Sequence, residues 1–138
     1  MAVMTTVGDV MGPVKVGLHP DQPLRAAAAA LAEAKTGLAV VTTPDGHGVF
    51  TERDLLRALA EGVDLDVTPV QAHMTGAPVA VPADRPLGEA CDLMIARGTR
   101  HLLVREGDQL VGILNMRDVV GVMSGAAELG SVPPAKGS

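Results

Sequence analysis

Residues 48–54 read Gly48-Val49-Phe50-Thr51-Glu52-Arg53-Asp54, and the organisation of the whole chain can be inferred from this motif. Its apolar run predicts the end of a strand, its threonine can cap a helix, and the residues that follow, 55–59, have helical character. The same arrangement returns 64 residues later as Gly112-Ile113-Leu114-Asn115-Met116-Arg117-Asp118. Because Gly, Arg and Asp recur at fixed offsets, the chain contains two copies of one strand–cap–helix unit.

The repeat extends well beyond this motif. Met11 matches Met74 at an offset of 63 residues, and one extra residue near 107–110 shifts the offset to 64. Matched positions run through residues 7–60 and 70–123. A unit of about 55 residues buries little surface on its own. We therefore expect the two copies to fold together, sheet against sheet.

Each copy predicts the order strand, helix, strand, strand, helix. An extended segment comes first, at residues 14–18 or 78–81, and a helix start containing proline follows. Asp21 and Asp84 are the candidate N-caps of these helices. A hairpin of two apolar strands then leads into the motif and its helix. The expected boundaries are repeat 1 at 7–61, a linker at 62–69, repeat 2 at 70–124 and a flexible tail at 125–138.

Composition argues against several classes of partner. The net charge of −5 disfavours nucleic acid, because neutralisation of phosphates drives that binding. Phe50 is the only aromatic residue, so platforms for stacking bases are missing. No apolar run approaches the length of a membrane span, and the first residues lack the features of a signal peptide, so we expect a cytoplasmic protein.

Catalysis and metal binding find no support in the residue pattern. Serine occurs only at Ser124, Ser131 and Ser138, outside any motif, and no glycine-rich phosphate loop is present. The four histidines are scattered and there is one cysteine, whereas a metal site needs three or four convergent ligands. We expect a protein that is not an enzyme and that requires no cofactor.

The tandem pattern Gly–apolar–apolar–Thr–x–x–Asp, at the end of a strand–strand–helix unit, resembles a pair of CBS domains, or Bateman module. Residues 7–11 and 99–104 support this resemblance, which covers nearly the whole chain. It implies an α+β fold of two β-α-β-β-α repeats, packed with pseudo-two-fold symmetry and with two clefts between their sheets. Such clefts bind adenosine-containing ligands, namely AMP, ADP, ATP or S-adenosylmethionine. The resemblance also implies that modules associate as homodimers.

Thr51 and Asp54 have two interpretations. They form a capping box in which two side chains satisfy free N–H groups at a helix start. In the ligand-binding interpretation, Asp54 accepts hydrogen bonds from ribose hydroxyls while Thr51 and the helix N-terminus face a phosphate. The two roles can coexist. The second copy keeps Asp118 but has Asn115 at the hydroxyl position, so we expect the first copy to bind ligand more tightly.

Basic residues near the motifs are either solvated charges or phosphate contacts. Arg100 and His101 precede a strand of the second copy, Arg53 and Arg117 precede the two aspartates, and Lys15 is a weaker candidate. The full set of candidate nucleotide-binding residues is Lys15, Val16, Gly37, Leu38, Thr51, Arg53, Asp54, Val79, Arg100, His101, Asn115, Arg117 and Asp118.

Two functions are compatible with these patterns. The first is a regulatory sensor that binds an adenosine ligand and reports to an unknown regulated protein. The second is a structural module for dimerisation or protein interaction, with degenerate and empty pockets. In either case, apolar faces at residues 24–31, 55–59 and 119–123 predict a homodimer.

Overall fold

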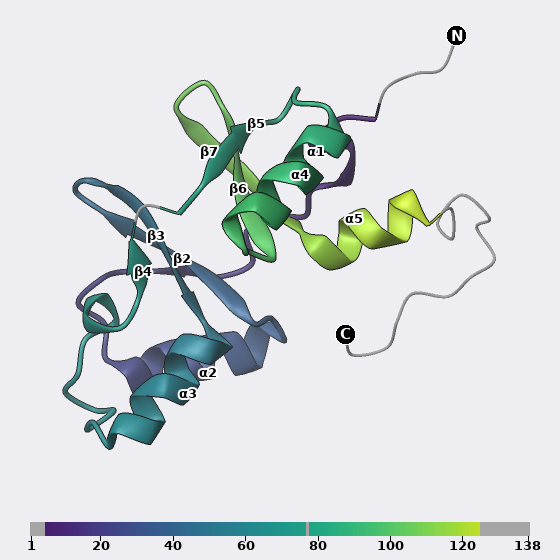
Figure 1. Ribbon diagram of the computed structural model, residues 1–138. Coiled ribbons are helices and arrows are strands. Elements are labelled where there is room, and N and C mark those ends of the chain that lie inside the picture. The colour runs from purple at the N-terminus through teal and green to yellow at the C-terminus, as the bar shows by residue number, and fades with distance from the viewer. Residues whose placement is uncertain (1–4, 77, 125–138) are drawn as a thin grey trace, which may run out of the picture. The chain divides into compact units, whose positions relative to one another are not determined.

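The structure is a computed structural model that describes residues 5–76 and 78–124 (Figure 1). The chain divides into two compact units. The first-repeat unit comprises Val14–Pro78, and the second-repeat unit comprises Met1–Pro13 together with Val79–Ser138. The expected tail at 125–138 lies outside the described residues.

The first-repeat unit is built on a four-stranded sheet in the order β1-β2-β3-β4. Helix α2 connects the parallel strands β1 and β2, β2 and β3 form an antiparallel hairpin, and α3 follows β3. Helices α2 and α3 pack beside one another (Figure 1). The elements are β1 Gly17–Leu18, α2 Leu24–Ala34, β2 Leu38–Thr43, β3 Gly46–Thr51, α3 Glu52–Glu61, the 3-10 helix η1 Val70–Ala72 and β4 Thr75–Gly76.

The second-repeat unit repeats this plan on a three-stranded sheet, β5-β6-β7. The register of its hairpin shifts between Val104 and Arg105, and this irregularity accommodates the extra residue of the second copy. The elements are α1 Val7–Val10, β5 Ala80–Pro82, α4 Leu87–Arg97, β6 His101–Glu106, β7 Gln109–Asn115 and α5 Met116–Met123. The predicted α+β class and the element order of both repeats are confirmed.

Each unit has its own apolar core. In the first-repeat unit Leu24 and Phe50 are fully buried, and Val70 joins them from the segment that follows the repeat. In the second-repeat unit Met94 and Leu114 are fully buried, and Val7 joins them from the start of the chain. The first residues of each repeat therefore lie in the unit of the other repeat, so the compact units do not follow the repeat boundaries 7–61 and 70–124.

The first residues of each repeat form backbone hydrogen bonds with the unit of the other repeat, at equivalent positions in the two units. Val70 N donates to Gln22 O at 2.8 Å, and Val7 N donates to Arg85 O at 2.9 Å. Each pair is related to the other by the offset of 63 residues. We call residues 5–13 and 65–76 the exchanged segments, and this backbone hydrogen bond is common to both.

Helices α2 and α4 begin directly after Pro23 and Pro86, which occupy the N-cap positions. The prediction that Asp21 and Asp84 cap these helices is wrong, because both lie two residues before the cap and no side chain caps either helix. Each helix has 11 residues. In the described part of the chain, no helix combines the length and apolarity needed to cross a membrane.

The free N–H groups of these helix starts bond to the exchanged segments instead. Leu24 N donates to Thr68 O at 2.9 Å, and the equivalent Leu87 N donates to Thr5 O at 2.9 Å. A helix start without a side-chain cap needs other acceptors for its first N–H groups. Residues 62–69, expected as a linker, therefore pack as an integral part of the first-repeat unit.

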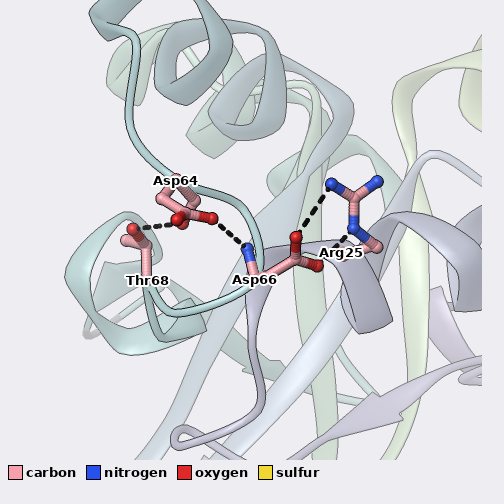
Figure 2. A network of polar contacts seen from close by, with 4 residues as sticks. All are labelled: Arg25, Asp64, Asp66 and Thr68. Atoms are coloured by element: carbon pink, nitrogen blue, oxygen red, sulfur yellow. Dashed lines mark hydrogen bonds and ion pairs between the residues drawn. The ribbon is translucent and has the colours of Figure 1, made fainter.

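Polar contacts also hold this segment on α2 (Figure 2). The Arg25 guanidinium forms a hydrogen-bonded ion pair with Asp66, and Asp66 N donates to Asp64 Oδ1 at 2.9 Å. Thr68 Oγ1 donates to Asp64 O at 2.7 Å. The hydrogen bond from Arg25 holds the pKa of Asp66 below its usual value. Gly88 stands at the position equivalent to Arg25, so the second-repeat unit lacks this ion pair.

Candidate functional site

The junction between β3 and α3 contains the capping box expected from the sequence. Thr51 Oγ1 accepts a hydrogen bond from Asp54 N at 3.3 Å, and Asp54 Oδ2 accepts one from Thr51 N at 2.9 Å. Thr51 Oγ1 also donates to the same carboxylate oxygen, at 3.2 Å. The capping interpretation of this pair is therefore confirmed, and the helix start is locally satisfied.

Asp54 is buried, with a side chain only 3% exposed, although its side chain is a polar carboxyl group. Arg57, one turn further along α3, donates from Nη2 to Asp54 Oδ1 at 3.1 Å. A buried carboxylate is costly without such partners. Arg57 was not among the predicted site residues, yet its i+3 spacing from Asp54 on a predicted helix was the available signal.

The other candidates of the first repeat gather at the same end of the sheet. Leu38 pairs with Thr51 across the hairpin, and Gly37 O accepts a hydrogen bond from Glu52 N at 3.0 Å. Val16, which is buried, directly precedes β1, and its carbonyl accepts a hydrogen bond from Val40 N of β2 at 2.9 Å. We call Val16, Gly37, Leu38, Thr51 and Asp54 the first site. Lys15 and Arg53 are exposed beside it.

The junction between β7 and α5 differs in detail from that of the first repeat. Asn115 is the N-cap, but its side chain accepts from Arg117 N at 3.0 Å instead of from the third helical residue. Asp118 is therefore released from the capping role that Asp54 has, and it is exposed. Within the described ranges, its carboxylate has no hydrogen bond or ion pair with another residue.

Strand starts again lie beside this junction. His101 pairs with Asn115, and Arg100 O accepts a hydrogen bond from Met116 N at 2.7 Å. Val79 O accepts from Leu103 N at 2.9 Å, which places Val79 at the same end of the sheet. The second site is defined by Val79, Arg100, His101, Asn115, Arg117 and Asp118.

The basic candidates have different surroundings. Arg53, Arg100 and Arg117 are exposed, and none of them forms an ion pair with a residue in the described part of the chain. His101 is half-buried, and its backbone lies against Thr99, whose hydroxyl donates to His101 O at 3.1 Å. Three exposed guanidinium groups are therefore available to an anionic ligand.

Other features of the described residues do not extend the two sites. No group of three histidine, cysteine or acidic side chains in residues 5–76 and 78–124 could hold a metal ion. A surface depression in the second-repeat unit is lined by Thr5, Leu87, Cys91, Asp92 and Val122, among others. None of the predicted nucleotide-binding residues lines this depression.

Comparison with known families identifies the architecture. The sequence matches the CBS domain over residues 7–61 and again over residues 67–125. The chain belongs to the CBS-domain family. It carries two adjacent copies, as the resemblance of the two motifs predicted, and it is a tandem module of this regulatory family.

Solved CBS structures share the fold. A CBS-domain-containing protein from Agrobacterium tumefaciens is 33% identical, with a TM-score of 0.77, and the match covers 87% of this chain and 94% of that protein. A CBS domain protein from Pyrobaculum aerophilum, whose structure is a complex with AMP, is 30% identical, with a TM-score of 0.78. That match covers 93% of this chain and 100% of the relative.

Curated sequences include much longer relatives. Arabinose 5-phosphate isomerase KdsD of Yersinia pestis is 33% identical over 105 residues. The match covers 75% of this chain but only 32% of the isomerase, so the chain spans about a third of that enzyme's length.

Proposed function

We propose that this CBS module is a non-catalytic sensor that binds an adenosine-containing ligand at its two sites. The observation that carries the proposal is the exposed carboxylate of Asp118, which lies in the first turn of α5, close to the backbone contact between Met116 and Arg100. A carboxylate can accept hydrogen bonds from both hydroxyls of a ribose, and an arginine can bind a phosphate with two parallel hydrogen bonds. The AMP complex of the relative from Pyrobaculum aerophilum supports the same class of ligand.

The base of such a ligand meets aliphatic and backbone groups. Phe50, the only aromatic residue of the chain, is fully buried in the first-repeat unit, so it cannot stack on a ligand. Adenine is therefore held by apolar side chains at the strand starts and by backbone hydrogen bonds. This arrangement predicts an affinity on the order of micromolar, below that of sites with aromatic stacking.

A thermal-shift experiment tests the ligand class. AMP, ADP, ATP and S-adenosylmethionine are each added to the purified protein at millimolar concentration. A ligand at 100 times its dissociation constant stabilises the folded state by about 2.7 kcal/mol, so at least one of the four raises the melting temperature. Asp118→Ala reduces that shift, whereas Asp108→Ala, in the exposed turn between β6 and β7, leaves it unchanged. If none of the four moves the curve, the module is structural and its sites are empty.

We also propose that the module forms a homodimer and presents its ligand state to a regulated protein. Leu56 and Leu59 on α3 are 66% and 52% exposed, and Val120 on α5 is 56% exposed. These side chains offer apolar surface for association. Of the faces expected from the sequence, Leu24 and Leu31 at 24–31 and Val119 at 119–123 are buried in the cores, so these three side chains are not available for association.

Light scattering after gel filtration tests the dimer. The expected mass is twice the chain mass of 14.1 kDa. Leu56→Asp places a charge on the apolar face and shifts the mass to that of a monomer. Ala60→Asp adds the same charge at another exposed position of α3, and it serves as the control that leaves the dimer intact. A wild-type monomer at tens of micromolar contradicts the dimer.

A further inference from the structure

The two sites differ most at one pair of equivalent positions. In each site, the first residue of the helix donates its N–H to the residue that precedes the neighbouring strand. In the first site Glu52 N donates to Gly37 O at 3.0 Å, and in the second site Met116 N donates to Arg100 O at 2.7 Å. The same backbone contact therefore brings together a carboxylate and a glycine in one site, but a thioether and a guanidinium in the other.

The side chain of Glu52 lies over Gly37. A Cβ atom added to Gly37 would be 2.6 Å from Glu52 Oε1 and 3.1 Å from Glu52 Cδ. The carboxylate thus occupies the space next to the strand start from which the equivalent Arg100 side chain extends. Since Glu52 is also the first residue of α3, its charge lies at the positive end of the helix dipole, where an anionic ligand group would otherwise bind.

The second carboxylate of the first site is also committed. Asp54 Oδ2 accepts two hydrogen bonds from Thr51, and Asp54 Oδ1 accepts one from Arg57. A carboxylate has about four lone-pair positions, so about one is left for a ligand. The equivalent of Arg57 in the second repeat is Gly121, and Asp118 retains its accepting capacity.

Resting on the proposed function, we propose that the two sites select different ligand classes and that Glu52 sets the difference. The second site takes phosphorylated adenosine ligands, because Arg100 and Arg117 are exposed there and Asp118 is the one carboxylate among the described residues of this site. The first site keeps Arg53, the equivalent of Arg117, but it has the carboxylate of Glu52 where the second site has Arg100. It therefore disfavours a phosphate at this position and takes adenosine ligands whose group there is neutral or cationic. For phosphorylated ligands this order is the reverse of the one expected from the sequence, which ranked the first copy as tighter.

Titration followed by two-dimensional NMR separates the two sites in the intact chain. AMP and adenosine are the probes, since they differ only by the phosphate. The backbone amides of residues 51–54 report the first site, and those of residues 115–118 report the second. We expect AMP to bind the second site about tenfold more tightly than the first, and adenosine to show no such preference.

Charge variants at the two equivalent positions test the role of Glu52. Glu52→Gln keeps the shape of the side chain and strengthens AMP binding at residues 51–54 by about threefold to tenfold, with adenosine unchanged. Met116→Glu weakens AMP binding at residues 115–118, and Met116→Gln is its uncharged control.

The outcomes separate this inference from the proposed function. The ratio of AMP affinity to adenosine affinity is compared between the two sites. If this ratio is the same at both sites, or if Glu52→Gln leaves it unchanged at the first site, Glu52 does not set the ligand preference, while the sensor function stands. If neither probe shifts either group of amides at millimolar concentration, both the proposed function and this inference fail.

Discussion

Met11 lies directly against Gly112, so that a Cβ atom added to this glycine would be 2.7 Å from the sulfur of Met11. The carbonyl oxygen of Gly12 is equally close, at 2.7 Å. In the first-repeat unit Met74 has the equivalent position, and a Cβ atom added to Gly48 would be 3.1 Å from its sulfur. The glycine that opens each motif is therefore required by the exchanged segment that crosses it, and no ligand is needed to explain it.

Gly112→Ala is expected to destabilise the protein by about 1–3 kcal/mol, the usual cost of overpacking. The methionine side chain can move away, but the backbone oxygen of Gly12 cannot do so without breaking the hydrogen bond that it accepts from Ile113 N at 2.9 Å. Gly121→Ala is the matched control, because α5 has open space at that position and alanine favours helices by about 1 kcal/mol. Urea unfolding measures both changes. Equal stability of the two variants contradicts the close contact.

Lys35→Gly is expected to stabilise the protein by about 0.5–1 kcal/mol. Lys35 ends α2 with a φ of 55°, in the left-handed region, and the equivalent residue that ends α4 is Gly98, with a φ of 65°. A side chain is strained in this conformation, whereas glycine is not. Gly98→Ala gives the opposite change by the same mechanism. Thermal unfolding of both variants checks the pair, and destabilisation by Lys35→Gly would refute the account of this helix end.

The Asp66 ion pair predicts a pH dependence of stability. Because the folded-state pKa of Asp66 is lowered, mainly by the hydrogen bond from Arg25, its contribution is present above the unfolded-state pKa of about 3.9. The contribution is lost as the pH falls through the lower, folded-state pKa. Wild type is therefore more stable than Asp66→Asn at pH 7, and the gap closes in strong acid.

Both groups are exposed, so salt is the control for this effect. In about 1 M sodium chloride the Debye length is about 3 Å, and the gap between wild type and Asp66→Asn narrows at pH 7. Urea unfolding midpoints of wild type and Asp66→Asn, at two pH values and two salt concentrations, measure this difference in stability. If the stability difference between the two proteins does not change with pH, the ion pair does not contribute and Asp66 acts only through the conformation of the loop.

The exchanged segments predict which fragments fold. A fragment of residues 14–78 contains Val70 and the acceptor for Leu24 N, so it should unfold cooperatively in urea. A fragment of residues 7–61, which follows the sequence repeat, lacks both and should not. Circular dichroism during urea titration distinguishes them. Cooperative unfolding of the repeat fragment alone would show that the segment exchange is not needed for stability.

Much of this fold was predictable because the same sequence pattern occurs in both copies, so each copy confirmed the interpretation of the other. The capping box of Thr51 and Asp54 and the order of the elements follow from local spacing, and both are present. The N-caps at Asp21 and Asp84 were predicted wrongly, because the first N–H groups of those helices bond to backbone carbonyls about 44 and 82 residues away in sequence.

Contacts of this kind leave little trace in local sequence. The exchange of the first segments is visible only once Val7 and Val70 are placed in the opposite cores. At the site, the position of Glu52 over Gly37 depends on the pairing of two strands across the hairpin. The charges were visible in the sequence, but the side chain that each charge faces was not.

Isothermal titration calorimetry of the intact chain with AMP is the decisive test of nucleotide binding by this module. We predict a saturable isotherm with a dissociation constant on the order of micromolar, which Asp118→Ala weakens about tenfold to a hundredfold, since a hydrogen bond to a charged group contributes about 1.5–3 kcal/mol. Titration at two temperatures prevents a vanishing enthalpy from hiding the binding. The absence of saturable heat at both temperatures, with AMP at millimolar concentration, would contradict the account.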